Sequence, residues 1–379
     1  MYTFAEFKET RRFAGLDGLR GLSIGLVLLH HLPRLPAGML RSVQENGRYG
    51  VSLFFVISGF LISSLLLRER DTYGRVMFTR FFARRALRLF PLYYTILGLV
   101  LALTYFTSVF SAHSAEVMRD NLPAYLLYCS NWLPNPMEGP FFFSWSLAAE
   151  EQFYTVFGVM MVFISRGTLL KSVGLLLVFK GVATVLVGAE DRSAVLWRIA
   201  LSVQEPILWG VMLGFALHLR ATYDRMVRPA GSAAIIAIVT LLCLVWMTTG
   251  PYRAIAAAEE QLLFPAFTFL VAAVVTRPRV PVLDGRWLSH VGQVSYAMYL
   301  IHWFVIMAVQ RVFPADASLP LFYAVVAVST VGIATLISIY FEQPLIAFGR
   351  ARFGPAGRVP RLLEPTVLGG PAVIPSARQ

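Results

Sequence analysis

A charged stripe within a hydrophobic stretch gives the first indication of chemistry in this chain. The stretch covers residues 16–33 and reads LDGLRGLSIGLVLLHHLP. Arg20 and His31 are eleven residues apart, so on a helix they share one face about 16 Å apart along the axis, with Asp17 near the same face. Ionisable side chains are costly in hydrocarbon and mark functional sites there. His31 is therefore a candidate general base; the alternative is a histidine that makes only an interhelical hydrogen bond.

A run of arginines suggests a site for an anionic ligand. Seven arginines lie between positions 68 and 88, ahead of a hydrophobic stretch that begins at Pro91. On a helix, Arg88 is four residues from Arg84 and three from Arg85, so these guanidinium groups can converge on phosphates. Anionic lipid headgroups are the alternative ligand.

Two adjacent acids, Glu150 and Glu151, enter another hydrophobic stretch in the segment FFFSWSLAAEEQFYTVFG. Tyr154 lies four residues after Glu150 on the same helical face, and we expect at least one acid to point into the bundle. A glutamate that reached His31 would orient the imidazole as a general base. The alternative is that one acid caps the start of the helix while the other faces water.

Further polar residues are candidates for supporting roles. The segment SYAMYLIHWFV places Ser295, Tyr299 and His302 on one stripe at spacings of four and three residues. We predict that His302 assists the site, with a hydrogen-bonded structural histidine as the alternative. Ser52 supplies a hydroxyl near the start of the stretch 50–67. The chain has two cysteines and no CxxC spacing, so no metal site is predicted.

These residues need helices to position them, and the composition favours a membrane-spanning bundle. Of the 379 residues, 57% are hydrophobic and 14% are charged, which is more apolar surface than a soluble core uses. We expect an all-α, polytopic membrane helix bundle with about ten transmembrane helices. The apolar stretches lie at 16–33, 50–67, 91–110, 141–164, 168–189, 196–219, 232–249, 259–276, 292–311 and 320–341.

The net charge of +12 is explained by membrane topology, without a nucleic-acid partner. Most lysines and arginines lie at the N-terminus, in the loops after every second apolar stretch and near the C-terminus, so both termini are predicted to be cytoplasmic. The bilayer is the expected partner of the apolar surface. One membrane domain is expected over residues 1–349, followed by a mobile cytoplasmic tail over 350–379 that is rich in Pro, Gly and Arg.

Five sequence blocks, taken in order, resemble the acyltransferase-3 family of integral membrane O-acyltransferases. The family pattern of a basic residue, ten residues and a histidine fits Arg20 and His31, and VSLFFVISGFLI follows. The block FFARRALRLFPLYY carries an Arg-x-x-Arg motif at Arg85 and Arg88. The blocks WSLAAEEQFY, SYAMYLIHW and ISIYFEQPLIAF complete the order. The resemblance extends over nearly the whole chain.

The resemblance implies transfer of an acyl group, commonly acetyl, from cytoplasmic acyl-CoA to a hydroxyl. The acceptor would be a carbohydrate-containing molecule such as a polysaccharide, a glycolipid or a glycosylated small molecule. Acyl-CoA would be a substrate, with no permanently bound cofactor, and the enzyme would lie in a bacterial inner membrane. The chain resembles the standalone members, which have no extracytoplasmic hydrolase-like domain.

The resemblance also implies roles for single residues. Arg84, Arg85 and Arg88 would hold the phosphates of CoA, and Arg20 would line the passage of the donor. His31 would deprotonate the acceptor hydroxyl with support from Glu150 or Glu151. A covalent acyl-histidine relay is the alternative mechanism.

A proton-coupled or lipid-linked-sugar transporter is the competing class of function, because intramembrane His, Arg and Glu would also suit it. Two features favour the enzyme: no inverted repeat is recognisable, and the arginine run at one membrane face suits an anionic donor. The sequence leaves open the acyl group, the acceptor and its hydroxyl, the side on which the acceptor binds and the oligomeric state.

Overall fold

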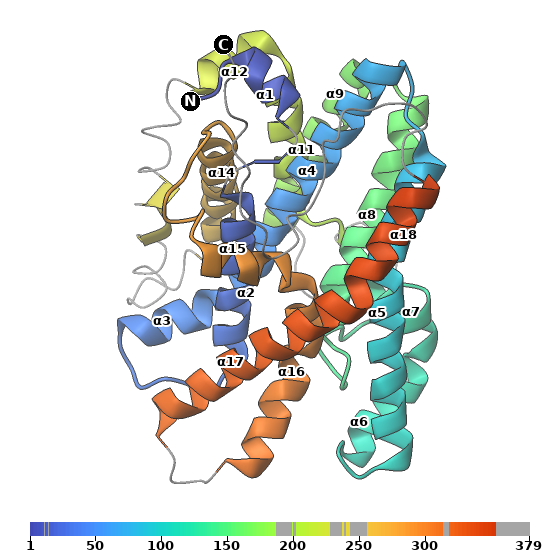
Figure 1. Cartoon of the computed structure of the whole chain (residues 1–379), viewed down its shortest axis with the longest axis vertical. Helices are drawn as coiled ribbons and strands as arrows, with labels where there is room; N and C mark the ends of the chain where they lie inside the picture. Colours follow the sequence, from blue (N-terminus) through green and yellow to red (C-terminus); the bar gives the residue numbers. More distant parts are fainter. Residues whose placement is uncertain are drawn as a thin grey trace, which may run out of the picture.

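The computed structural model describes residues 1–10, 12–13, 15–186, 199, 202–227, 237–238, 240–242, 256–313 and 318–353. Within these residues the chain is helical and contains no strand, which confirms the predicted all-α class (Figure 1). In chain order the longer elements are α1 (Phe4–Glu9), α2 (Leu16–His31), α3 (Met39–Glu45), α4 (Tyr49–Tyr73), α5 (Phe78–Phe106), α6 (Ala112–Asp120), α7 (Leu122–Leu126), α8 (Ser144–Phe163), α9 (Arg166–Leu186), α11 (Glu205–His218), α12 (Arg220–Val227), α14 (Ala256–Val275), α15 (Arg286–Gln293), α16 (Ser295–Val312), α17 (Leu319–Ile337), η5 (Ser338–Glu342) and α18 (Gln343–Phe353).

Three helical segments in the described residues are long and apolar enough to cross a membrane, namely Met39–Tyr73, Phe78–Phe106 and Leu319–Phe353. A fourth candidate is the pair α15 and α16, which is bent by 79° at the junction. The described residues therefore do not confirm the predicted count of about ten. One reason is that α2 has only 16 residues, or about 24 Å, less than the thickness of a hydrocarbon core. Another is that the predicted stretch 232–249 lies mostly outside the described residues.

The helix α5 begins earlier than the sequence suggested. The arginine run was expected in a loop before Pro91, whereas the helix starts at Phe78 and carries Pro91 in its interior. Arginine and alanine are good helix formers, and Phe78–Phe90 supplies several turns of support before the proline. Arg84, Arg85 and Arg88 therefore project from one regular helix, which fixes the direction of each side chain.

Close helix contacts hold α4 against α11 and α2 against α15. A Cβ atom on Gly59 of α4 would overlap the carbonyl oxygen of Ile207 in α11, and one on Gly210 would overlap that of Val56. Gly292 of α15 meets the carbonyl of Asp17 in the same way. Small residues at such crossings let backbones approach closely, which is the usual way of packing helices in membranes.

The face of α2 that carries Arg20 and His31 points into the bundle. Ile24 and Val27 lie between them on this face, and both side chains are fully buried in a core shared with α5 and α16. This burial is expected of a functional stripe, because a helix face turned toward lipid would leave Arg20 without a polar environment.

The segments α17, η5 and α18 form one continuous run that crosses the front of the bundle diagonally (Figure 1). The middle piece, η5, is a single π-helical turn and contains the buried Glu342. Such turns inside helices are frequent at functional sites. The helix α18 continues to Phe353, past the predicted boundary at residue 349, and the rest of the predicted tail lies outside the described residues.

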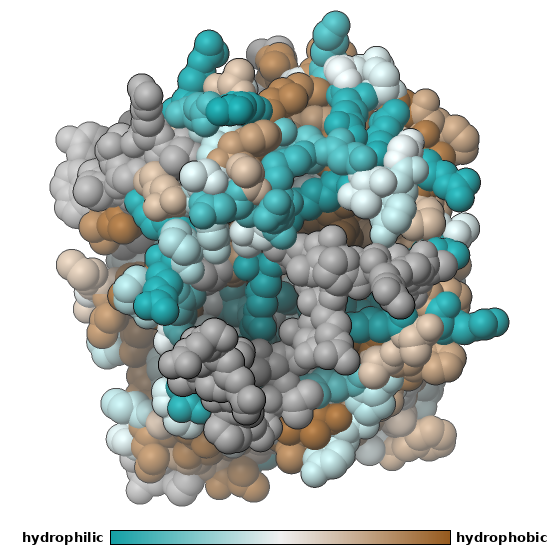
Figure 2. All heavy atoms as spheres, turned by 45° about the horizontal axis from the view of Figure 1, so that its top comes forward, coloured by the Kyte–Doolittle hydropathy of each residue, from teal (hydrophilic) through white to brown (hydrophobic). Residues whose placement is uncertain are grey.

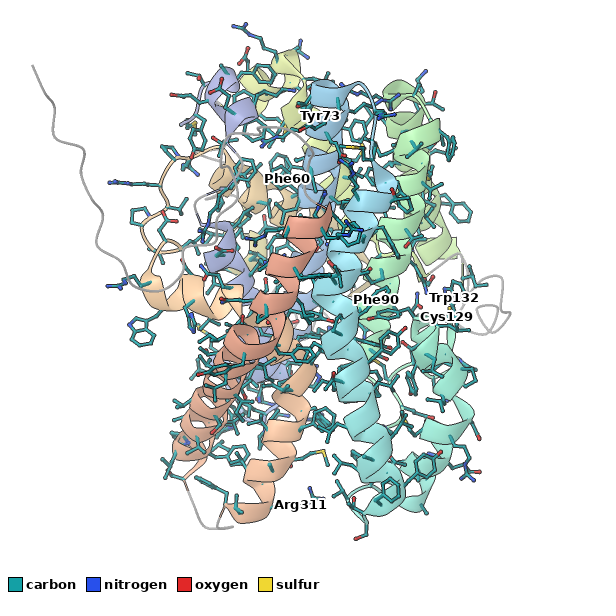
Figure 3. All side chains as sticks on the ribbon, turned by 45° about the vertical axis from the view of Figure 1, so that its right-hand side comes forward. Phe60, Tyr73, Phe90, Cys129, Trp132 and Arg311 are labelled. Atoms are coloured by element: carbon teal, nitrogen blue, oxygen red, sulfur yellow. The ribbon has the colours of Figure 1, made fainter. Side chains whose placement is uncertain are left out.

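The molecule has two distinct ends, which we call the Tyr73 end and the Arg311 end. Tyr73 closes α4 at the top of Figure 3, Arg311 lies at the bottom in the last turn of α16, and Phe90 of α5 lies between them. The predicted topology makes the Tyr73 end cytoplasmic.

Candidate active site

His31, the last residue of α2, has its imidazole fixed by the backbone. Its Nδ1 lies 2.8 Å from the carbonyl oxygen of Val27. A carbonyl oxygen only accepts, so Nδ1–H donates, and the neutral ring keeps a lone pair on Nε2. The side chain is half-buried, which leaves it within reach of a substrate. The geometry therefore presents Nε2 as a proton acceptor.

A second imidazole lies directly beside the first. The ring centroids of His31 and His302 are 4.9 Å apart. The Nδ1 of His302 lies 2.6 Å from the carbonyl oxygen of Tyr299 and donates to it. Its Nε2 is buried and has no hydrogen-bond partner among the described residues. Because a buried acceptor without a donor is costly, this nitrogen marks a place where a donor is expected.

Aromatic side chains frame His31. The ring of Phe142 lies 5.7 Å and that of Trp303 6.1 Å from the His31 ring, and Phe142 and Trp303 contact each other edge to face at 5.2 Å. Large apolar rings at these positions limit access of water to the imidazole and strengthen polar interactions beside it. Neither ring was singled out from the sequence, although Trp303 follows His302 directly and Phe142 lies in the run FFF before α8.

The polar residues predicted to form one stripe on α16 have different surroundings. The Tyr299 hydroxyl lies 2.6 Å from Ser146 Oγ and donates to the carbonyl of Phe143 at 3.0 Å, which ties α16 to the start of α8. The Ser295 hydroxyl is buried and has no hydrogen-bond partner in the described part of the chain. Ser52 lies half-buried on α4.

The acids of α8 meet Arg85 of α5 in a partly buried group that we call the Arg85 cluster, made of Arg85, Glu150, Glu151, Tyr154 and Ser58. Arg85 Nε donates to Glu151 Oε1 at 3.1 Å, and Arg85 Nη2 lies 3.5 Å from Glu150 Oε1. The guanidinium carbon lies 3.3 Å from the centre of the Tyr154 ring. The hydroxyls of Tyr154 and Ser58 both donate to Glu150.

This arrangement differs from the expected support of His31 by a glutamate. Both carboxylates turn toward Arg85, since a buried carboxylate needs a cation or several donors, and α5 provides the cation. The tautomer of His31 is fixed by the Val27 carbonyl instead. Arg85 therefore pairs with two protein carboxylates, whereas the resemblance implied that it would hold a phosphate of CoA.

Arg20 and Arg88 remain available to an anionic ligand. Each interacts electrostatically with Glu342 of η5, and the two cations repel each other. Neither guanidinium group has a hydrogen bond or a salt bridge to the described residues. Arg88 is exposed and Arg20 half-buried, so water reaches the space between α2, α5 and η5. An excess of one positive charge over Glu342 suits a phosphate there.

The remaining predicted residues lie elsewhere. Arg84 donates to the carbonyl of Phe353 at 2.7 Å and so satisfies the end of α18. Asp17 lies 2.8 Å from Arg12 and accepts from Gln293 at 3.4 Å, at the start of α2. An acid is favourable in the first turn of a helix, and Asp17 serves there without contacting His31.

The space near the Tyr73 end is open to solvent. Figure 2 shows a hollow in the face obtained by tilting the top of Figure 1 forward, with hydrophilic side chains along its visible depth. Phe90, two residues after Arg88, lies at mid-height in Figure 3, so the arginines of α5 lie between the Tyr73 end and the middle of the molecule.

Comparison with known proteins identifies the family of the chain. A family described as an acyltransferase domain, of the acyltransferase-3 type, matches residues 13–339. A protein of Staphylococcus aureus strain COL, provisionally named an O-acetyltransferase, is 28% identical over 374 residues, covering 90% of this chain and 58% of its own length. The O-acetyltransferase OatA of Staphylococcus aureus strain NCTC 8325 is 26% identical, covering 88% of this chain and 57% of its own length.

The chain thus spans less than three-fifths of the length of these curated relatives. No solved structure matches the chain.

Proposed function

The chain belongs to the acyltransferase-3 family, and from this premise we propose that it is a membrane O-acyltransferase that moves an acyl group, most simply acetyl, from acyl-CoA to a hydroxyl of a carbohydrate-containing acceptor. The observation that carries the proposal is that Arg20 and His31 lie on one face of α2. Its His31 end presents an unprotonated Nε2 inside an aromatic frame, while its Arg20 end meets Arg88 in a water-accessible space.

The distribution of charge supports a position for the donor. The phosphates of CoA are held by Arg20 and Arg88, the two predicted donor arginines that have no hydrogen-bonding partner among the described residues. The distance along α2 from Arg20 to His31 is about 16 Å, which the long pantetheine arm bridges to bring the thioester to the imidazole. Acyl-CoA enters at the Tyr73 end, taken as the cytoplasmic side of a bacterial inner membrane.

The reaction needs one base and one leaving group. His31 Nε2 accepts the proton of the acceptor hydroxyl as its oxygen attacks the thioester carbonyl carbon. A carbon–oxygen bond forms, the carbon–sulfur bond breaks, and the CoA thiolate takes the proton from His31 to leave as free thiol. The Val27 carbonyl holds Nδ1–H throughout, so loss of the Nε2 proton restores the neutral ring in its starting tautomer.

His302 supports the step in which His31 carries a positive charge. When Nε2 of His31 becomes N–H, a hydrogen bond to the lone pair on His302 Nε2 satisfies both nitrogens. The Arg85 cluster holds α4, α5 and α8 in register around the donor space and has no direct part in proton transfer.

The proposal is tested with purified full chain in detergent, by measuring free thiol released from acetyl-CoA together with labelled acetyl on a mixture of bacterial glycans and glycolipids. An acyltransferase releases thiol and labels an acceptor without a sealed compartment. A transporter requires a gradient across a closed membrane, and movement of substrate without thioester turnover would overturn the proposal.

A further inference from the structure

A pocket opens at the Arg311 end, on the side of the molecule opposite the arginines of α5. Its volume is about 290 Å³, at the lower limit for small-molecule sites. The lining comes from the segment between α5 and α6, the start of α6, the segment before α8 and one face of α16, with the residues Val109, Phe110, Ser111, Ser114, Gly139, Pro140, Trp303 and Met307.

One wall of this pocket is also part of the active-site frame. Trp303 lines the pocket, and its ring lies 6.1 Å from the His31 ring. Phe142 contacts both rings. Trp303 therefore borders both the pocket and His31, so a molecule held in the pocket lies against a side chain that frames the imidazole.

The walls of the pocket are built by specific local contacts. Ser111 caps the start of α6, accepting from the Ser114 backbone N–H at 3.2 Å, and the two serine hydroxyls lie 3.0 Å apart. Gly139 has a φ of 84° and packs on Val117, so a side chain there would be strained and would collide with α6. Arg311 donates to the carbonyl of Val109 at 3.2 Å and fixes the rim.

The chemistry of the lining selects a class of ligand. Trp303 and Phe110 offer flat apolar surfaces, Ser111 and Ser114 offer hydroxyls, and no lining residue is charged. A neutral sugar ring matches this combination, since its C–H face packs on an aromatic ring while its hydroxyls pair with serines. A carboxylate or phosphate in the same place would lose water without meeting a charged lining residue, and the guanidinium of Arg311 at the rim already donates to the Val109 carbonyl.

Resting on the proposed function, we infer that this pocket binds a neutral pyranose ring of the acceptor, which enters from the Arg311 end and presents a hydroxyl to His31 past Trp303. Donor and acceptor then reach the imidazole from opposite ends of the molecule. This arrangement lets a single base serve two substrates that never share an entrance.

The test measures sugar binding without acyl-CoA, by saturation-transfer NMR on the full chain in detergent. The probes are the methyl glycosides of glucose, galactose and N-acetylglucosamine, with methyl glucuronide as the charged comparison. At least one neutral glycoside is expected to bind, and Trp303→Leu is expected to weaken it by about tenfold through loss of the aromatic contact. Trp287→Leu is the matched control, because Trp287 of α15 is 85% exposed and lies outside the pocket.

A second variant guards against a folding defect. Met307→Trp places a larger side chain of α16 in the pocket, which reduces the space for a ligand. It should block binding while the melting temperature stays near that of the native chain. Absence of binding by every neutral glycoside, tighter binding of the glucuronide, or unchanged binding in both pocket variants would overturn the inference. Trp303-dependent binding without any acyl transfer would instead contradict the proposed function and leave the pocket standing.

Discussion

His31 and His302 lie with their ring centroids 4.9 Å apart, and the Nδ1 of each ring donates to a backbone carbonyl of its own helix. The two rings therefore both keep Nε2 as an acceptor in their neutral forms. The buried Nε2 of His302 has no donor among the described residues. We propose that His31 supplies this donor when its own Nε2 takes a proton.

This pairing makes His302 a positioning residue whose role can be measured. His302→Leu removes the acceptor and is expected to lower kcat by about 10- to 100-fold, a smaller loss than removal of the general base itself. His302→Gln places an amide oxygen near the position of Nε2 and should recover much of the rate. Equal losses in the Leu and Gln variants, at matched protein abundance, would show that His302 only fills space.

The arginines of α5 should differ sharply in their effect on the donor. Arg88→Ala or Arg20→Ala removes a charge-assisted contact to phosphate, for which we expect a loss of about 1.5–3 kcal/mol, or roughly 10- to 100-fold in the affinity for acetyl-CoA. Arg84→Ala is the control, because Arg84 is bonded to the carbonyl of Phe353. Isothermal titration with acetyl-CoA measures all three. A similar loss for Arg84 and Arg88 would contradict the assignment.

The Arg85 cluster predicts a large effect on stability. Arg85→Met leaves the buried Glu151 and the half-buried Glu150 without their cation, and removing one partner of a buried pair costs about 3–5 kcal/mol. The thermal midpoint of the purified protein should fall accordingly, and much of it should return when Glu151→Leu is added. If the double variant is no more stable than Arg85→Met alone, the cluster is not a paired unit.

The close contact of α4 with α11 predicts a steric effect at one glycine. Gly59→Ala pushes a methyl group against the Ile207 carbonyl, and overpacking of this kind costs about 1–3 kcal/mol. Gly98→Ala on α5 is the control, since nothing lies within 4 Å of a Cβ placed there. Melting curves of the two variants should separate clearly. Tolerance of alanine at Gly59 would mean that the helices can slide apart at no cost.

Sequence patterns predicted the helices better than the contacts between them. The helix over 16–33 is confirmed, with Arg20 and His31 on one buried face, because periodicity depends only on local spacing. The fate of Arg84 could not be predicted, since its partner, the carbonyl of Phe353, is 269 positions away. The same holds for Glu151 and Arg85, which come from separate helices.

Other features of the site could not be predicted from residue spacing alone. The fixed tautomer of His31 depends on its position in the last turn of α2, where Nδ1 reaches the carbonyl four residues back. Trp303 directly follows His302, which was predicted. Its place in the pocket at the Arg311 end, however, depends on the segment between α5 and α6, which folds against α16. The predicted number of spans is not confirmed in the described residues, because α2 is too short to cross and the α15–α16 pair is bent.

We propose that His31 is the base of an acyl transfer from acyl-CoA. The most direct measurement compares labelled acetyl transfer from acetyl-CoA in membranes that contain the native chain or His31→Ala at matched abundance, with both labelled glycan or glycolipid and free thiol recorded. Loss of a general base should lower both signals by about 10²- to 10⁴-fold in the variant. Equal transfer and equal thiol release by the two proteins would show that His31 is not the base.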